Sequence, residues 1–317
     1  MASNEPGQPA AMSTDWTHSL ETPASALAIG AHPDDVEFGA GGTLAKWAAA
    51  GCRVMHLVCT DGSKGTWDAS ADITALVTRR EEEQREANRL LNGGVSTDVV
   101  FLGRVDGELT ADREACSAVA RVIRELRPEV VLGHDPWKRY RLHPDHREAG
   151  RLACEGIVAA RDPHFFPEHG LEPHRPSHLV LWEADEPNHV EDISSSIDIK
   201  LAALEAHVSQ FKSTMRAIDE NGLARFRKRI RERANELGRP HGLGAAEAFH
   251  LMSDLYSPRP KTTRAGPGGP ARNPEGSRRS PATCRSLLGS LLRSSLPSRC
   301  LLGSLLRSSL PSRCLLG

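Results

Sequence analysis

Paired cysteines are missing from this chain of 317 residues. It contains seven cysteines, an odd number, and no two of them form a C-x-x-C pair. We therefore expect neither a disulfide framework nor a cysteine-based structural zinc site. We expect a reducing, cytoplasmic location. The segment before Ala24 has neither a basic start nor an apolar core, so the sequence predicts no signal peptide.

Long hydrophobic runs and aromatic residues are also scarce. No run reaches the roughly 18 apolar residues of a membrane-spanning helix, so no integral membrane span is expected. Aromatic residues are few, at 4%, but the hydrophobic fraction of 39% is sufficient for one sizeable core or two small domains.

Charge is distributed unevenly along the chain. Of the net charge of −1, the segment from Pro258 onward carries +10, and the preceding residues carry −11. An acidic main body argues against nucleic acid as a partner. The basic segment contains the unit LLGSLLRSSLPSRC twice, at Leu287–Cys300 and Leu301–Cys314. We expect a disordered basic tail there; the alternative is a basic amphipathic anchor, which a proline in each repeat opposes.

Short apolar runs alternate with helical patterns from Ala24 to about Tyr256. The runs predict strands at Ala24–Ala31, Arg53–Cys59, Asp98–Leu102, Glu129–Gly133 and Ser177–Trp182. The patterns predict helices at Gly39–Ala50, Thr78–Leu91, Arg113–Leu126 and Asp145–Ala159. This alternation predicts an α/β fold with a mainly parallel sheet and helices on both faces. Ligands bind such sheets beyond the carboxyl ends of the strands.

The later part of the sequence is less regular. It predicts an edge strand at Ile193–Ile199, helices at Lys200–Phe211 and Ala224–Leu237, and a last strand at Ala245–Met252. The whole chain is expected to comprise a disordered segment at 1–23, a catalytic domain at 24–257 and the tail at 258–317.

Two clusters of histidine and aspartate follow the first and fourth predicted strands. They are Ala31-His32-Pro33-Asp34-Asp35 and His143-Pro144-Asp145-His146. Imidazole and carboxylate groups are ligands of zinc and of iron(II). His32, Asp35 and His146 would supply three ligands and leave a position for water, as a catalytic metal requires. Spacing alone leaves His143 as an alternative to His146.

The remaining groups of the two clusters can move protons. Asp34 can accept a proton from a metal-activated water, whose pKa falls to about 7; its alternative role is a helix N-cap. An imidazole held by a carboxylate, such as His143 near Asp145, can stay protonated near neutral pH. It can then stabilise an oxyanion or protonate a leaving amine. The indicated chemistry is metal-assisted hydrolysis of an unactivated bond.

Four further motifs complete a resemblance to a known family. They are Glu37-x-Gly39-x-Gly41-Gly42, Thr60-Asp61-Gly62, Arg80-Glu81-Glu82-Glu83-Gln84-Arg85 and Asp106-Gly107. With the two clusters, and over roughly residues 24–254, they resemble the PIG-L/LmbE family of metal-dependent N-deacetylases. The resemblance implies a Rossmann-like fold with the metal site at the carboxyl ends of the strands. It also implies removal of acetyl groups from N-acetylglucosaminyl compounds, and it makes 24–257 the deacetylase domain.

The resemblance also assigns roles to residues. It implies that His32, Asp35 and His146 bind zinc, with iron(II) as the alternative metal, and so chooses between the two histidines by analogy. It implies that Asp34 is the base and that His143, oriented by Asp145, is the electrophilic or acid partner.

Three further residues are implied as substrate contacts: Arg80, Asp106 and His207. Their plainer roles would be a surface arginine among glutamates, a turn residue and a structural helix residue, respectively.

We therefore expect a zinc-dependent deacetylase of an N-acetylglucosamine-containing small molecule, with a homo-oligomer left open. Within the enzyme class, the rival is an amidase that cleaves a larger conjugate such as a mycothiol S-conjugate. The rival from another class is a non-catalytic metal-dependent carbohydrate-binding module, which the presence of both Asp34 and His143 disfavours. A dinucleotide-binding oxidoreductase is disfavoured because G-x-G-x-x-G is incomplete and the strand-end loop is acidic.

Overall fold

A computed structural model describes residues 16–253 and 255. The chain divides into a unit spanning Met1–Arg259 and a unit spanning Pro260–Gly317. The basic tail expected at 258–317 lies outside the described residues.

The strands are β1 Thr17–His18, β2 Ser25–Gly30, β3 Arg53–Thr60, β4 Val99–Arg104, β5 Val130–His134, β6 His178–Trp182, β7 His189–Asp192 and β8 Ala246–Ser253. The helices are α1 Asp35–Ala49, α2 Ile73–Leu91, α3 Arg113–Leu126, α4 Pro144–Ala160, α5 Ile197–Glu205 and α6 Glu220–Gly238, with short 3-10 turns η1 Pro167–His169, η2 Val208–Gln210 and η3 Arg239–His241.

The strands form one sheet in the order β1-β7-β8-β6-β5-β2-β3-β4. All neighbouring pairs are parallel except the two that involve β8, which runs antiparallel to both β6 and β7. This confirms the predicted α/β class and the mainly parallel sheet. Because β2 lies between β5 and β3, segments more than a hundred residues apart leave the sheet side by side.

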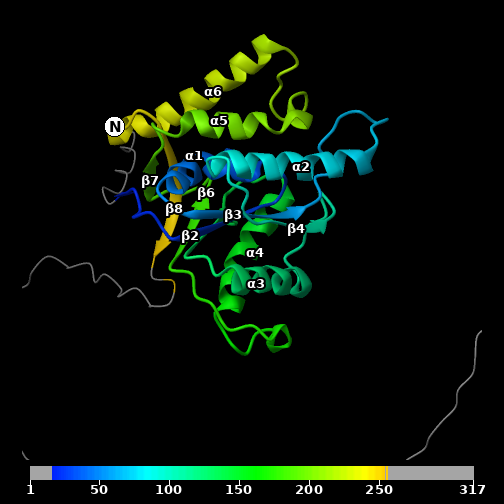
Figure 1. The fold of residues 1–317 in the computed structure, drawn as a ribbon, viewed down its shortest axis with the longest axis vertical. Helices are drawn as coiled ribbons and strands as arrows, with labels where there is room; N and C mark the ends of the chain where they lie inside the picture. The colour runs from blue at the N-terminus through cyan, green and yellow to red at the C-terminus, as the bar shows by residue number, and fades with distance from the viewer. Residues whose placement is uncertain (1–15, 254, 256–317) are drawn as a thin grey trace, which may run out of the picture. The chain divides into compact units, whose positions relative to one another are not determined.

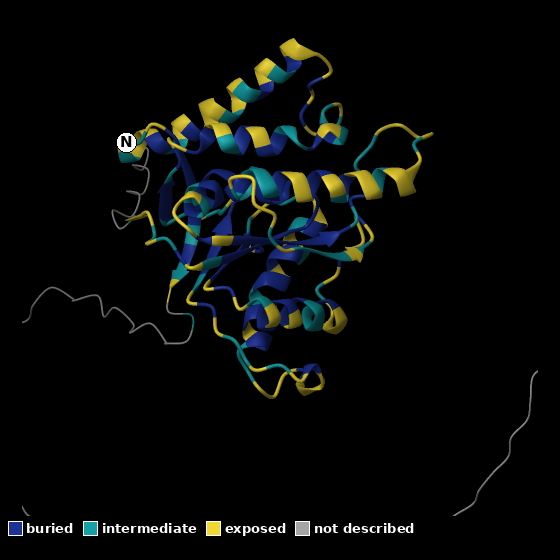
Figure 2. Cartoon of the chain, in the orientation of Figure 1, coloured by how far each residue is buried: buried dark blue, intermediate teal, exposed yellow. Residues whose placement is uncertain are grey.

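Helices cover both faces of the sheet (Figure 1). Helices α1, α2 and α5 lie over one face, and α3 and α4 lie over the other. The strand sequences explain this arrangement, since Leu27 and Ile29 of β2 join the core under α3 and α4, whereas Ala26 and Ala28 join the core under α1. Figure 2 shows the central strands largely buried, with exposed residues on the outer surfaces of α2 and α6. Residues that alternate along a strand point to opposite faces, so both faces need apolar side chains.

Local signals set several helix boundaries. Asp72 and Asp112 each precede a helix, and each side chain accepts a backbone N–H from three residues further on, Ala75 and Ala115 respectively. Such caps satisfy amide groups that the first turn leaves unpaired.

One expectation for the less regular part of the chain is wrong. Ile193–Ile199 is not an edge strand, because residues 193–196 form a turn and α5 begins at Ile197. The strand lies earlier, at His189–Asp192, where His189 and Glu191 are buried and pair with each other at 2.9 Å. Pairing lets a polar sequence occupy a buried strand, so hydropathy does not reveal it.

The other expected elements need smaller changes. Within the segment expected to be disordered at 1–23, Thr17–His18 forms β1 against β7. The helix expected at Lys200–Phe211 ends at Glu205 and continues as η2. The helix at Ala224–Leu237 and the last strand at Ala245–Met252 are confirmed as α6 and β8. Among the helices in residues 16–253, none has the length and apolar character that crossing a membrane requires.

Candidate active site

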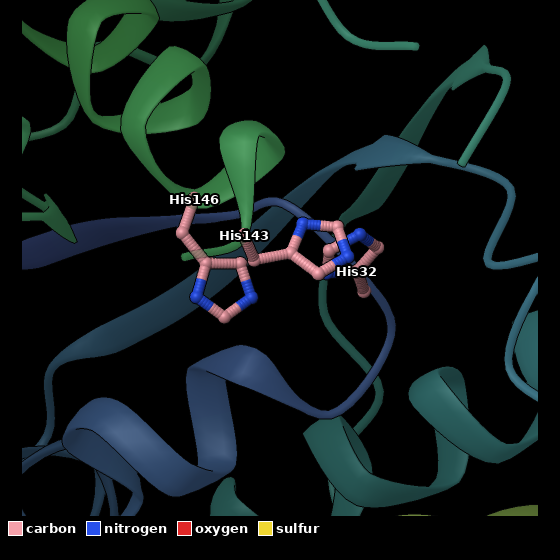
Figure 3. A group of neighbouring side chains, drawn as sticks. All are labelled: His32, His143 and His146. Atoms are coloured by element: carbon pink, nitrogen blue, oxygen red, sulfur yellow. The ribbon is translucent and has the colours of Figure 1, made fainter. Parts of the chain in front are cut away.

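The two predicted clusters meet at the carboxyl edge of the sheet. The first cluster follows β2, and the second opens α4 after β5, the strand that pairs with β2. Figure 3 shows the His32, His143 and His146 imidazoles close together, two from the start of α4 and one from the loop after β2. The His32 ring centroid lies 4.6 Å from that of His143 and 5.2 Å from that of His146. The strand order thus brings both clusters into one site.

His32 is held by carboxylates on both ring nitrogens. Its Nδ1 lies 3.3 Å from Asp35 Oδ2, while its Nε2 lies 3.1 Å from Asp106 Oδ1 and 3.2 Å from Asp145 Oδ2. Burial alone would lower the pKa of His32, but hydrogen bonds to Asp106, Asp145 and Asp35 outweigh it and raise that pKa to about 12. Several carboxylates around one imidazole form an anionic site that favours a cation.

Asp35, the last residue of the first cluster, contacts the second cluster. Its Oδ1 is 3.4 Å from His146 Nε2, and its Oδ2 accepts the backbone N–H of His32 at 2.8 Å. Burial opposes ionisation, but His146 and His134 hold the pKa of Asp35 well below its usual range. Burial also lowers the pKa of His146 to about 4, even though Asp35 favours its charged form. His146 is therefore neutral at pH 7, the protonation state in which imidazole binds a metal.

Several overlapping sets of side chains could hold a metal in the described residues. One set is His32, His143 and His146; a second is Asp35, His134 and His146; a third is His32, Asp106 and Asp145. In each set, one candidate ligand atom per residue lies within 4.8 Å of the others. None of these sets contains all three predicted ligands, His32, Asp35 and His146, although the three residues are neighbours of one another. Their assignment as the metal ligands therefore stays a prediction.

Asp34 is buried, with 5% of its surface exposed, and it has a positive φ of 103°. It stands at the N-cap position of α1, but its side chain makes no capping hydrogen bond, which disfavours the alternative role as a cap. Burial raises the pKa of Asp34 to about 6, although Arg80 opposes this shift. A carboxylate with a raised pKa beside candidate metal ligands is suited to accept a proton.

Arg80 is not a surface residue. It lies on α2 with 3% exposure, donates to the backbone oxygens of Pro33 at 2.6 Å and Gly62 at 2.8 Å, and approaches Asp34 Oδ2 at 3.7 Å. Gly62 has a φ of 65°, and a Cβ there would lie 2.5 Å from Arg80 Nη1, so the Thr60-Asp61-Gly62 motif leaves room for the guanidinium. Arg80 therefore orders the loop that carries Asp34, and it also lines the cavity.

Gln84 follows Arg80 by one helical turn and faces the same site. Its Oε1 accepts the backbone N–H of Asp34 at 2.9 Å, and its Nε2 donates to Glu37 Oε1 at 2.8 Å. The charged motif on α2 thus presents residues 80 and 84 inward, because residues four apart share a helix face.

Asp145 does not take its expected place beside His143. It is fully buried in the first turn of α4, where it contacts His32 Nε2 and accepts the backbone N–H groups of Gly107 at 2.6 Å and Leu109 at 3.2 Å. His143 precedes the helix and is exposed. Within residues 16–253, no hydrogen bond or ion pair joins these two side chains, so the expectation that Asp145 orients His143 is corrected: it holds His32.

His207 is also placed differently from the expectation. It is fully buried, its Nε2 lies 3.4 Å from Glu37 Oε2, and it is not part of the cavity lining. Its expected contact with substrate is therefore wrong. Asp106 does line the cavity, with one oxygen near His32 and the other accepting the Lys64 backbone N–H at 3.0 Å. Its contact with substrate stays a prediction.

Sequence reasoning missed His134. It is the last residue of β5, its Nε2 lies 3.2 Å from Asp35 Oδ2, and its ring stacks on His146 with centroids 4.3 Å apart. The signal was its position directly at the end of the fourth predicted strand, where ligands collect.

A cavity of about 730 Å³ opens onto the site. Its lining includes Lys64 and Trp67 from the loop after β3, and Arg233 of α6. The space is adequate for a small molecule, whose sites are typically about 300–1,000 Å³.

The fold and site together define an α/β protein with a histidine and carboxylate centre at the carboxyl edge of a parallel sheet. Residues 27–157 match the PIG-L family model, described as GlcNAc-PI de-N-acetylase. The chain is 39% identical over 188 residues to diacetylchitobiose deacetylase of Thermococcus kodakarensis, which covers 58% of this chain and 69% of the relative. The chain therefore belongs to the PIG-L family of de-N-acetylases.

Two further similarities extend this result. The structure resembles N,N'-diacetylchitobiose deacetylase from Pyrococcus horikoshii with a TM-score of 0.67 and 31% identity, covering 76% of this chain and 88% of that one. The chain is also 34% identical over 168 residues to 1D-myo-inositol 2-acetamido-2-deoxy-alpha-D-glucopyranoside deacetylase 1 of Catenulispora acidiphila, covering 45% of this chain. It spans 51% of that relative's length.

Proposed function

We propose that the protein is a metal-dependent hydrolase that removes the acetyl group from an N-acetylglucosamine-containing small molecule. The observation that carries the proposal is the convergence of His32, Asp35 and His146 beside the buried carboxylate of Asp34, at the edge of a cavity. The two relatives named as deacetylases of diacetylchitobiose and of a glucosaminyl inositol indicate the substrate class.

The donor set fits a zinc or iron(II) ion. Two imidazoles and a carboxylate are borderline ligands of the kind these ions take. The carboxylates of Asp35, Asp106 and Asp145 around His32 supply negative charge that a divalent cation would balance. His32, Asp35 and His146 would hold the ion.

When bound, a divalent ion in such a site polarises the amide carbonyl and makes water a better nucleophile. Asp34 then accepts the proton from the attacking water, and Arg80 keeps the Asp34 loop in place through the backbone oxygen of Pro33. His143 lies exposed at the cavity, where it can stabilise the oxyanion and protonate the departing amine. The C–N bond breaks, and acetate and a free amino sugar leave.

The test is release of amine and acetate from a panel of substrates. The panel comprises diacetylchitobiose, an N-acetylglucosaminyl inositol and a mycothiol S-conjugate, each offered to demetallated protein reloaded with zinc or iron(II). We expect equal amounts of amine and acetate from at least one N-acetylglucosaminide, and none after chelation. Cleavage of the conjugate alone would identify an amidase. Sugar binding with no turnover of any substrate would identify a carbohydrate-binding module. Each of these two results would contradict the proposal.

A further inference from the structure

Three buried side chains lie in a row at the carboxyl edge of the sheet: Asp35, His134 and Trp182. They are 8%, 1% and 1% exposed, respectively. His134 and Trp182 are paired residues at the ends of the adjacent parallel strands β5 and β6, and Asp35 follows β2 on the other side of β5. The strand order alone therefore places one residue from each of three neighbouring chain segments in contact.

The hydrogen bond between Trp182 and His134 fixes the position of the imidazole proton. Trp182 Nε1 donates to His134 Nδ1 at 2.9 Å. An indole N–H can only donate, so Nδ1 must be the acceptor, and a neutral His134 carries its proton on Nε2. Arg141 Nη1, another group that can only donate, lies 3.2 Å from the same Nδ1. Both donors thus require the same tautomer; the third neighbour of Nδ1, Glu183 Oε2, lies 3.8 Å away, beyond hydrogen-bond distance.

The protonated nitrogen of His134 faces the carboxylate of Asp35. Nε2 lies 3.2 Å from Oδ2, which also accepts the backbone N–H of His32 at 2.8 Å. Oδ2 therefore accepts the backbone N–H of His32 and lies within ion-pair distance of His134 Nε2, while Oδ1 faces His146 Nε2 at 3.4 Å. A nitrogen that carries a proton cannot bind a metal, so His134 is not itself a ligand in this arrangement.

We infer that His134, oriented by Trp182, is a positioning residue that fixes the carboxylate of Asp35 so that Oδ1 is presented to the metal. This inference rests on the proposed metal site. Partners of this kind, which hold a metal ligand in its orientation, typically strengthen metal binding by about 10–100-fold.

Gly39 shows why the motif after the first cluster needs a glycine at this position. A Cβ on residue 39 would lie 2.5 Å from Cδ2 of Trp182 and 2.7 Å from its Cδ1. A larger residue would displace the indole from His134. The Glu37-x-Gly39 spacing thus belongs to the support of the site as well as to the packing of α1 on the sheet.

The test compares two amide replacements of His134 that differ in reach. In H134Q the amide N–H can occupy the place of Nε2, whereas in H134N the shorter side chain cannot. Zinc affinity is measured for each folded protein by competition with a coloured chelator, without substrate. We expect H134N to bind zinc about 10–100-fold more weakly than the wild type and H134Q to recover most of that loss.

Three additional variants complete the design. W182F removes the indole donor and should weaken zinc binding less than H134N, and the W182F/H134N double variant should be no weaker than H134N alone, because Trp182 acts through His134. H189N replaces an equally buried histidine, 1% exposed, in β7, and should leave zinc affinity unchanged.

Three results would overturn the inference. Wild-type affinity in H134N would show that the Nε2 donor does not matter. Complete loss of zinc in both His134 variants, equal to the loss in H146A, would make His134 a ligand. Additive losses in the double variant would separate Trp182 from His134. Because zinc alone is the probe, each outcome is independent of whether the protein deacetylates the proposed substrates.

Discussion

Replacing Asp34 with asparagine should stabilise the metal-free protein at neutral pH while abolishing hydrolysis. Asp34 is 5% exposed, and burial raises its pKa from the usual 3.8 to about 6 despite the nearby Arg80. At pH 7 the carboxylate is therefore ionised in surroundings that favour its neutral form. Asparagine removes this charge, and it also tolerates the positive φ of 103° at this position.

The size of the gain follows from the pKa. The difference between 3.8 and about 6 corresponds to about 3 kcal/mol of unfolding free energy, at about 1.36 kcal/mol per pKa unit. Between these two values the folded chain binds more protons than the unfolded chain, so the ionised group makes the wild type less stable as pH rises. The D34N variant lacks this dependence. Its advantage should be full above pH 6 and should largely vanish near pH 4.

The measurement is urea unfolding of chelator-treated wild type and D34N at about pH 7 and about pH 4. Asp112 supplies a control of opposite sign, because its hydrogen bonds to backbone amides at the start of α3 lower its pKa. D112N should lower stability at pH 7. If D34N were no more stable than the wild type at pH 7, or equally stabilised at pH 4, the reasoning about the buried carboxylate would be refuted.

Three other predictions concern the metal, the acid and the tail. His32→Ala and His146→Ala should each lower the zinc bound per chain sharply, as measured by elemental analysis, and full zinc content in both would remove the proposed ligands. His143→Ala should keep zinc but lower kcat by about 10²–10⁴-fold, whereas loss of zinc would exchange the roles of His143 and His146. A chain ending at Leu255, which packs on the core under α3 and α4, should keep the Tm and kcat/KM of the full chain. A large drop in either quantity would mean that residues beyond 255 support the domain.

The sequence predicted the class of fold because apolar runs and helical patterns are local properties. The five strands expected between residues 24 and 182 are present as β2, β3, β4, β5 and β6. Sequence failed at β7, where His189 and Glu191 satisfy each other inside the structure. A polar strand of this kind can be recognised only when both partners are seen together.

The candidate site likewise combines features that the sequence predicts with features that only the tertiary structure shows. The motifs around His32 and His143 determined where the site lies, since strand ends in a parallel sheet converge on one edge. Arg80 and Gln84 lie among charged residues typical of a solvated helix face, and only the packing of α2 shows that both point inward.

Contacts between distant segments were decided by tertiary structure alone. The order β6-β5-β2 brings Trp182 to His134 and His134 to Asp35, and the fold of α4 places Asp145 on His32 instead of His143. A sequence specifies which side chains follow each strand, but strand order determines which of them meet. Hydrogen bonds act over about 3 Å. The pairing that fixes each imidazole and carboxylate therefore exists only once the sheet has formed.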